Sequence, residues 1–88
     1  MDAVFLFHEG GNIIMWTEGS AVVVNTDAGK RYVRVTIFGD SVPVTMPTNG
    51  AGIDGLNADD ILSAGCKFYC VGNGKLFILN SAGSWVEQ

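Results

Sequence analysis

The residues of this chain that could do chemistry are few and scattered along it. Its single histidine, His8, precedes Glu9, and a histidine beside a carboxylate is a combination used in acid–base catalysis. No nucleophile can be placed near His8 from the sequence, however, and Gly10-Gly11 indicates a turn there. We therefore expect His8 to be a solvated or interface residue, and we predict that the chain is not an enzyme.

Carboxylates and thiols could hold a metal ion, but their spacing fits no common site. Asp54, Asp59 and Asp60 lack the alternating spacing of a calcium loop. Cys66 and Cys70 are separated by three residues, and with the one distant histidine they do not form a zinc pattern. On one extended strand the two cysteines would lie about 13 Å apart, too far for a disulfide. We predict no metal, and two small apolar core residues in a reducing compartment.

Two further patterns could bind a ligand. The segment Gly50–Gly55 matches G-x-G-x-x-G, but the dinucleotide fingerprint needs a strand before it and a long helix after it. Pro47 ends the preceding segment, so we interpret Gly50–Gly55 as a flexible loop and predict no cofactor. Trp16 and Trp85 could stack on a sugar or a base, although tryptophan in a small β-protein is more typical of a core or a protein interface.

The element with the strongest local signal is a hairpin near the C-terminus. Two strands rich in aromatic and branched residues flank Asn73-Gly74, a dipeptide typical of a type I′ turn. A turn centred there places Phe68 opposite Leu79, and a turn centred one residue earlier shifts the register without changing the faces. A three-residue loop, Gly72–Gly74, would exchange the faces of one strand. In the first two registers one face holds Phe68, Cys70, Phe77 and Leu79, and the other holds Tyr69, Val71, Leu76 and Ile78.

The N-terminal half is predicted to contain a second hairpin and a short strand. The hairpin joins Ala3–Phe7 to Ile13–Trp16 and places Phe5 opposite Trp16. Its side chains are apolar on both faces, as in the C-terminal hairpin. Ala21–Val24 is an uninterrupted apolar run, which predicts a short buried strand.

The middle of the chain is predicted to contain one alternating strand and one extended segment. Lys30–Phe38 alternates strictly, with Val33, Val35 and Ile37 on one face. Because this pattern is typical of a half-solvated strand, we expect it near an edge or on the outer face. Val42–Pro47 is extended and carries two prolines, which predicts an edge strand or an arm.

Only one short stretch has helical character. Asn57 is suited to the N-cap, and Asp59 and Asp60 would lie in the first turn, where the helix dipole favours acids. We predict one short helix near residues 58–63. With six to seven short strands and frequent turns, the fold class is all-β, a small antiparallel sandwich or barrel. The 88 residues form a single β-rich domain, 1–88.

Composition excludes several classes of partner. Hydrophobic residues make up 48% of the chain and charged residues only 16%, below the usual ~25%. The net charge of −4 argues against a nucleic-acid backbone and against anionic lipid. No apolar run is long enough to span a membrane, and the N-terminus lacks the pattern of a signal peptide. We therefore expect neither nucleic acid nor membrane as a partner.

The same composition predicts contacts with other protein chains. Both hairpins are apolar on both faces, so one face of each is expected in the core and the other against neighbouring proteins. We predict a homo-oligomer, for example a trimer, in which closed symmetry protects the strand edges. The predicted interface residues are Leu6, Ile13, Met15, Tyr69, Val71, Leu76, Ile78 and Trp85.

A family resemblance covers about half of the chain. The segment from Met46 to Trp85, with Gly74-Lys75-Leu76-Phe77 and Gly83-Ser84-Trp85 near its end, resembles small structural proteins encoded in the morphogenesis clusters of tailed bacteriophages. The resemblance transfers no catalytic residue. It implies a virion protein made in the host cytoplasm, packed with other virion proteins.

Three functions follow as expectations. The first is a capsid-associated decoration or head-fibre protein that acts by self-association and packing on the particle. The second is an accessory protein of the tail, neck or baseplate. The third, from another class, is a monomeric acidic binding module that recognises or inhibits a host protein.

Overall fold

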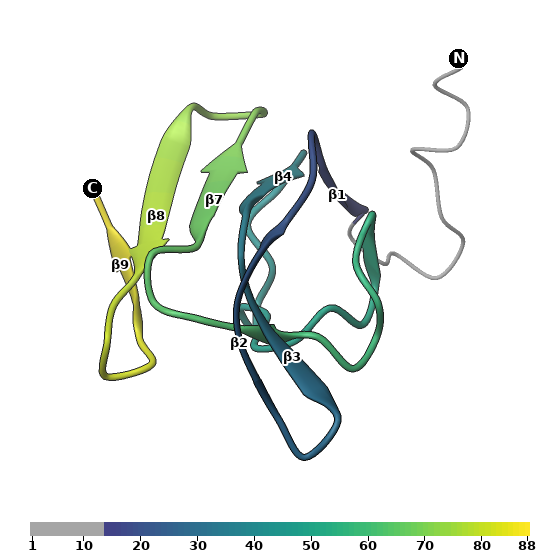
Figure 1. Cartoon of the computed structure of the whole chain (residues 1–88). Coiled ribbons are helices and arrows are strands. Elements are labelled where there is room, and N and C mark those ends of the chain that lie inside the picture. The colour runs from purple at the N-terminus through teal and green to yellow at the C-terminus, as the bar shows by residue number, and fades with distance from the viewer. Residues whose placement is uncertain (1–13) are drawn as a thin grey trace.

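Short strands joined by turns and loops build the described fold. The computed structural model describes residues 14–88, and Figure 1 shows them as two small sheets joined by turns. The prediction of an all-β fold is confirmed, with a sandwich-like arrangement of two sheets. The strands are β1 (Met15–Thr17), β2 (Val22–Asp27), β3 (Lys30–Arg34), β4 (Thr36–Gly39), β5 (Ile53–Asp54), β6 (Ile61–Leu62), β7 (Lys67–Cys70), β8 (Lys75–Leu79) and β9 (Trp85–Glu87).

The larger sheet has the order β5-β1-β4-β7-β8-β9, and the smaller has the order β2-β3-β6. Hairpin neighbours pair antiparallel, as expected, but β1–β5, β3–β6 and β4–β7 pair parallel. Parallel neighbours need a long connection between them, and residues 40–66 supply it for β4 and β7. The sheets are therefore mixed.

The core lies between the two sheets. We call the side of the six-stranded sheet that faces the core its inner face, and the opposite side its outer face. Buried side chains from both sheets meet at the inner face, because alternate residues of each strand point to it. The buried apolar residues are Val33, Val35, Ile37, Ile53, Leu62, Cys66, Phe68, Cys70 and Leu79.

The alternating run over Lys30–Phe38 is confirmed in its faces but not in its position. Val33, Val35 and Ile37 are buried, as expected. However, the chain changes sheets at Val35, and β3 and β4 are both interior strands of their sheets. The alternation reports a solvated face of the sheet, which an interior strand has as much as an edge strand does.

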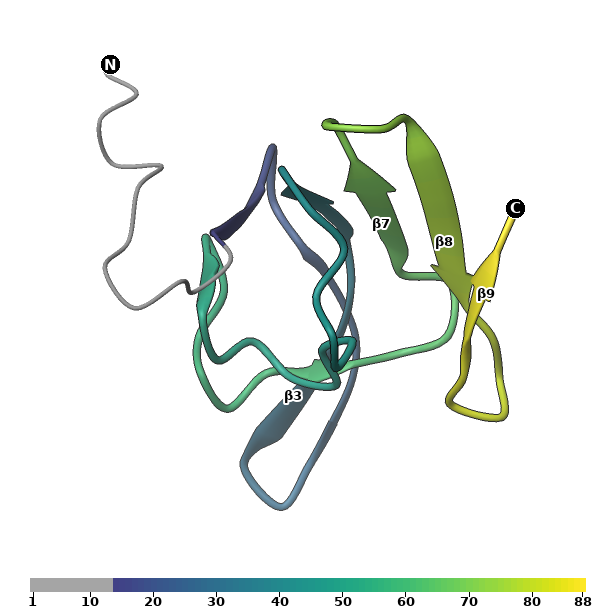
Figure 2. The ribbon, with the colours of Figure 1, turned by 180° about the vertical axis from the view of Figure 1, so that it is seen from behind.

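The prediction of a buried strand at Ala21–Val24 is wrong. All six residues of β2 are exposed, including three consecutive valines. β2 is an edge strand whose described neighbour is β3 alone, and the β2–β3 hairpin projects away from the larger sheet (Figure 2). An uninterrupted apolar run therefore marks an exposed edge here and not the core.

The predicted helix near residues 58–63 is absent. Residues 57–60 form a turn, closed by a hydrogen bond from Asp60 N to Asn57 O of 3.0 Å, and Ile61–Leu62 continues as β6. The side chain of Asp60 points into the protein and binds Arg31, so it does not act as an exposed first-turn acid. Residues 14–88 contain no helix long and apolar enough to span a membrane.

The segment Gly50–Gly55, predicted as a flexible loop, is folded and contains β5. Gly50 N donates to Asp60 O at 2.8 Å, and Ile53 is buried in the core. A Cβ at Gly50 would meet the carbonyl oxygen of Asn57, so the glycine permits close backbone packing. Val42–Pro47, predicted as an edge strand or an arm, precedes it and is neither: it forms no strand, bends at Val44 and Thr45, and packs Val42 and Met46 against the core.

The C-terminal hairpin forms in one of the registers that the sequence predicts. Phe68 pairs with Phe77 and Cys70 with Lys75, which is the register centred on Gly72-Asn73. The faces are therefore those predicted. The N-terminal hairpin differs, because β1 pairs with β4 on one side and β5 on the other. Its predicted partner strand, Ala3–Phe7, lies outside the described residues.

Candidate functional site

The outer face of the six-stranded sheet carries an unusual row of side chains. Trp16 on β1, Phe38 on β4 and Tyr69 on β7 are register partners and so project from the same side of the sheet. Leu76 on β8 continues the row beyond Tyr69. None of these four side chains packs against the buried core cluster, so the row lies on the side of the sheet away from the core.

Three aromatic rings form one end of this row, which we call the aromatic half. The ring centroids of Trp16 and Phe38 are 6.1 Å apart with planes inclined by 17°, and those of Phe38 and Tyr69 are 6.2 Å apart with planes at 82°. Both arrangements are favourable for aromatic pairs. Tyr69 is 37% exposed and the other two are half-buried, so the described structure leaves aromatic surface open to a partner.

Aliphatic side chains form the other end of the outer face, which we call the aliphatic half. It comprises Leu76, Ile78 and Val86, with Val71 in the turn after β7. Ile78 and Val86 are register partners on β8 and β9. Val71 is 43% and Val86 45% exposed, and Leu76 and Ile78 are half-buried. Exposed apolar side chains grouped in this way mark a contact surface for another molecule.

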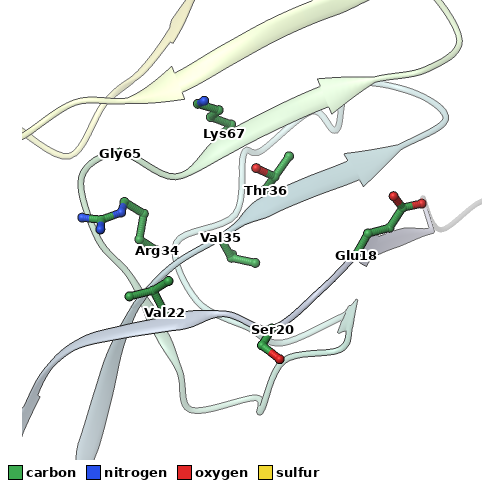
Figure 3. Close-up of a pocket in the computed structure, with 8 residues that line it drawn as sticks. All are labelled: Glu18, Ser20, Val22, Arg34, Val35, Thr36, Gly65 and Lys67. Carbon is green, nitrogen blue, oxygen red and sulfur yellow. The ribbon is translucent and has the colours of Figure 1, made fainter.

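A pocket of about 320 Å³ adjoins the aromatic half, and its lining is mostly polar. Thr36 and Lys67 are partners on β4 and β7, and each lies two residues from Phe38 or Tyr69 on the same strand and face. Arg34 and Glu18 lie at opposite ends of the pocket (Figure 3). The lining residues are Glu18, Ser20, Val22, Arg34, Val35, Thr36, Gly65 and Lys67.

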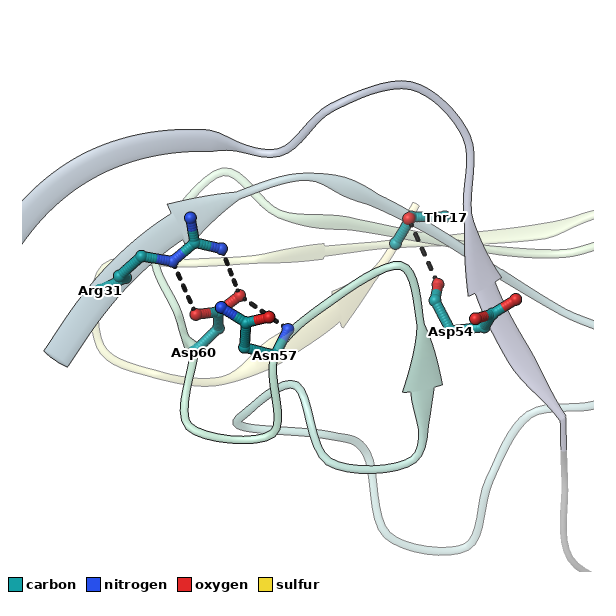
Figure 4. A network of polar contacts seen from close by, with 5 residues as sticks. All are labelled: Thr17, Arg31, Asp54, Asn57 and Asp60. Carbon is teal, nitrogen blue, oxygen red and sulfur yellow. Dashed lines mark hydrogen bonds and ion pairs between the residues drawn. The ribbon is translucent and has the colours of Figure 1, made fainter.

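The strongest polar network lies elsewhere, between β3 and the turn before β6. Asp60 is 1% exposed, and its carboxylate accepts two hydrogen bonds from the Arg31 guanidinium and one from Asn57 N (Figure 4). The bond from Arg31 holds the pKa of Asp60 below its ordinary value; burial opposes this and the Asn57 bond adds to it. Nearby, Thr17 Oγ1 donates to Asp54 O at 3.3 Å and joins β1 to β5. These contacts hold β5 and the turn before β6 against their neighbouring strands.

The two cysteines have a structural role. Both are free and buried, as predicted. Cys66 Sγ donates to Val33 O at 3.4 Å, and Cys70 Sγ to Asp40 O at 3.6 Å. Burial raises the pKa of the Cys66 thiol, which keeps it protonated and unreactive at neutral pH. Both sulfurs therefore fill the core as small apolar groups.

The predicted interface residues divide between the two faces of the sheet. Tyr69, Val71, Leu76 and Ile78 lie on the outer side, as their pattern indicated. Met15 and Trp85 are half-buried and pack against the core, and Trp85 Nε1 donates to Pro47 O at 2.8 Å. His8, with Leu6 and Ile13 of the predicted interface, lies outside the described residues.

The sequence did not reveal the pocket or the aromatic half. Arg34 and Thr36 occupy the outward positions of the alternating run, which is the signal that places them away from the core. Their neighbour Lys67 is 31 positions further along the chain than Thr36, and only the parallel pairing of β4 with β7 brings the two together. No local pattern indicates that pairing.

Among residues 14–88 no three histidine, cysteine or acidic side chains gather in a group that could hold a metal ion. The geometry of the described residues offers two surfaces: an apolar outer face and a polar pocket at its border. Comparison with protein-family models, with curated proteins and with solved structures found no match for the chain.

Proposed function

We propose that this chain is a structural protein of a bacteriophage virion, of the capsid-associated decoration or head-fibre type. It acts by packing the aliphatic half of its outer face on copies of itself and on other proteins of the particle. The observation that carries the proposal is the aliphatic half, where Leu76, Ile78 and Val86 lie on the side of the sheet opposite the core.

The energetics of burial support this proposal. Covering apolar side chains contributes roughly 25 cal/mol for each Å² removed from water, before the cost of association is subtracted. The inner face of the same sheet already packs against β3 and β6, so a thin sheet with two apolar faces needs a second cover. The resemblance of the C-terminal half to phage morphogenesis proteins supports the virion as the place where that cover is found.

The experiment compares the assembly state of the wild-type chain with that of Ile78→Ser by sedimentation velocity. We expect the wild type to form an oligomer such as a trimer and Ile78→Ser to shift toward monomer. Lys30→Gln, at the exposed first residue of β3 and away from this face, is the matched control and should sediment as the wild type does. A wild-type chain that is monomeric at all concentrations would overturn the self-association. Mass spectrometry of purified particles tests the virion assignment.

An accessory protein of the tail, neck or baseplate would use the same face, and the position of the chain in labelled particles separates it from a capsid protein. A second class of function has one observation in its favour. The aromatic half is the kind of exposed aromatic patch expected of a monomeric module that recognises or inhibits a host protein. Such a module would stay monomeric. Replacing Tyr69 would abolish its binding to the host protein and would leave its monomeric state unchanged.

A further inference from the structure

The pocket beside the aromatic half contains positive charge that the rest of the described chain does not neutralise. The whole chain has five cationic side chains against nine acidic ones. Among residues 14–88, ion pairs join Arg31 to Asp60 and Lys75 to Glu87. No acid within that range pairs with Arg34 or Lys67, yet both line the same pocket. With Glu18 as the one acid in its lining, the pocket has two cations and a net positive charge on an acidic protein, which favours an anionic ligand.

The backbone fixes the positions of both cations. The aliphatic part of Arg34 lies over Gly65, where a Cβ would approach Arg34 Cδ to 2.8 Å. Gly65 has a φ of +96°, a conformation that favours glycine. Lys67 N donates to Val35 O at 3.1 Å, which holds Lys67 beside its partner Thr36. The base of each cationic side chain is therefore fixed by the fold before any ligand arrives.

The pocket also has hydroxyl and carboxylate groups, and aromatic rings lie next to it. Thr36 and Ser20 supply hydroxyls, and Glu18 supplies an acceptor at the end opposite Arg34 (Figure 3). Phe38 and Tyr69 are two residues along the same strands from Thr36 and Lys67, a distance of roughly 7 Å by the rise of a strand. A ligand the size of one or two sugar rings would span both parts.

We propose that the pocket and the aromatic half together bind an acidic saccharide. The carboxylate of the sugar pairs with Lys67 and Arg34. Its hydroxyls form hydrogen bonds with Thr36, Ser20 and Glu18. The apolar side of a sugar ring packs on Phe38 and Tyr69. This binding function goes beyond the proposed structural role, which uses the aliphatic half of the same sheet.

The mixed chemistry of the site favours a saccharide over a protein or a nucleic acid as the ligand. The centre of a protein–protein interface is depleted of charged residues, whereas here Lys67 lies two residues along β7 from Tyr69 and shares the pocket with Arg34. A nucleic acid would also stack on aromatic rings, but a protein of net charge −4 repels its phosphates. A saccharide carries apolar and hydroxyl faces on one ring, and a single carboxylate needs only the two cations present.

The test uses the full chain and acidic oligosaccharides with neutral counterparts: 3′-sialyllactose against lactose, and trigalacturonate against cellotriose. Binding is followed by the NMR shifts of the Trp16 indole and the Thr36 and Lys67 amides. We expect at least one acidic sugar to bind with a Kd of about 1 mM and its neutral counterpart to bind more weakly. Lys67→Gln should weaken binding about tenfold, as expected for loss of a charge-assisted hydrogen bond. Phe38→Leu should also weaken it.

Two controls separate this site from the proposed assembly surface. Lys30→Gln removes the same charge away from the pocket and should leave sugar binding unchanged. Val86→Ser, on β9 and one strand further from Lys67 than Ile78, should shift the assembly state and leave sugar binding unchanged. No binding of either acidic sugar at about 10 mM, or equal binding of acidic and neutral sugars, would overturn the proposal. If Lys67→Gln lost its assembly but bound the acidic sugar as tightly as the wild type, the whole outer face would be assigned to protein contacts. That result would also overturn the saccharide proposal.

Discussion

Arg31 and Asp60, 29 residues apart in the sequence, form a two-pronged ion pair that ties β3 to the turn before β6. Arg31 Nε donates to Asp60 Oδ1 at 2.9 Å, and Nη2 donates to Oδ2 at 2.8 Å. The arginine side chain is 42% exposed, while the aspartate side chain is almost completely buried. A buried carboxylate is tolerated only where its oxygens are bonded, so this pair determines where the turn can lie against the sheet.

Replacing the buried carboxylate should destabilise the fold more than replacing its exposed neighbour. Asp60→Ala leaves Asn57 N without its acceptor and removes both bonds from Arg31, so we expect a loss of roughly 2 kcal/mol in the free energy of unfolding. Asp59→Ala removes the same charge at an exposed position and serves as the control. Urea denaturation followed by tryptophan fluorescence measures both. Equal losses in the two variants would contradict the structural role of the pair.

The same pair gives the protein a defined sensitivity to acid. Because the Arg31 bond lowers the pKa of Asp60 in the folded state, the unfolded chain takes up its proton first as the pH falls. The stabilisation is therefore complete above the ordinary aspartate pKa of about 3.9 and is lost as the pH falls below it. We expect Asp60→Asn to have a flatter stability curve than the wild type between about pH 5 and pH 3. Parallel curves for the two proteins would contradict this.

Cys66 should make the protein sensitive to alkali. Burial raises the pKa of its thiol in the folded state, so the unfolded chain releases the proton at lower pH. The contribution to stability is complete below the ordinary thiol pKa of about 8.5 and is lost as the pH rises toward the folded value. Urea denaturation at rising pH should show a decline that is smaller in Cys66→Ala. An identical decline in both would show that the buried thiol does not cause it.

The elements that follow from local pattern were predictable. The alternation of Val33, Val35 and Ile37 identified a buried face, and the aromatic and branched runs around Asn73-Gly74 identified a hairpin with the correct faces. Each of these signals depends on side chains within a few residues of one another, and their spacing reflects the period of two of a strand.

The elements that depend on distant partners were not predictable. The local sequence predicts Asp60 as an acid in the first turn of a helix, because nothing near it in the sequence indicates its ion pair with Arg31. The apolar run Ala21–Val24 predicts a buried strand. Its exposure could not be predicted, because the burial of a strand depends on which strands and layers lie beside it. The aromatic half needs both the antiparallel β1–β4 and the parallel β4–β7 pairings, so its three rings share no local spacing.

Alanine substitutions at two glycines distinguish the effect of steric crowding from the effect of backbone conformation. At Gly50 a Cβ would collide with the backbone oxygen of Asn57, whereas at Gly74, with φ +75°, it would meet nothing within 4 Å. We expect Gly50→Ala to lower the free energy of unfolding by roughly 3 kcal/mol, since backbone atoms must move. Gly74→Ala should cost about 1 kcal/mol, the usual penalty for a left-handed side chain. Thermal denaturation of both variants tests the order, and a larger loss at Gly74 would contradict it.

The turn between β2 and β3 offers a stabilising substitution. Asp27 pairs with Lys30, so Ala28 and Gly29 form the two-residue connection, and both have positive φ, at 53° and 81°. Alanine is disfavoured in this conformation, while asparagine tolerates it and is common at the first position of such turns. Ala28 is exposed, so Ala28→Asn should raise the free energy of unfolding by about 0.5–1 kcal/mol through the backbone alone. Ala82→Asn, at another exposed turn alanine but one without positive φ, is the control and should change stability little. A loss of stability in Ala28→Asn would show that the turn does not hold the left-handed conformation at this position.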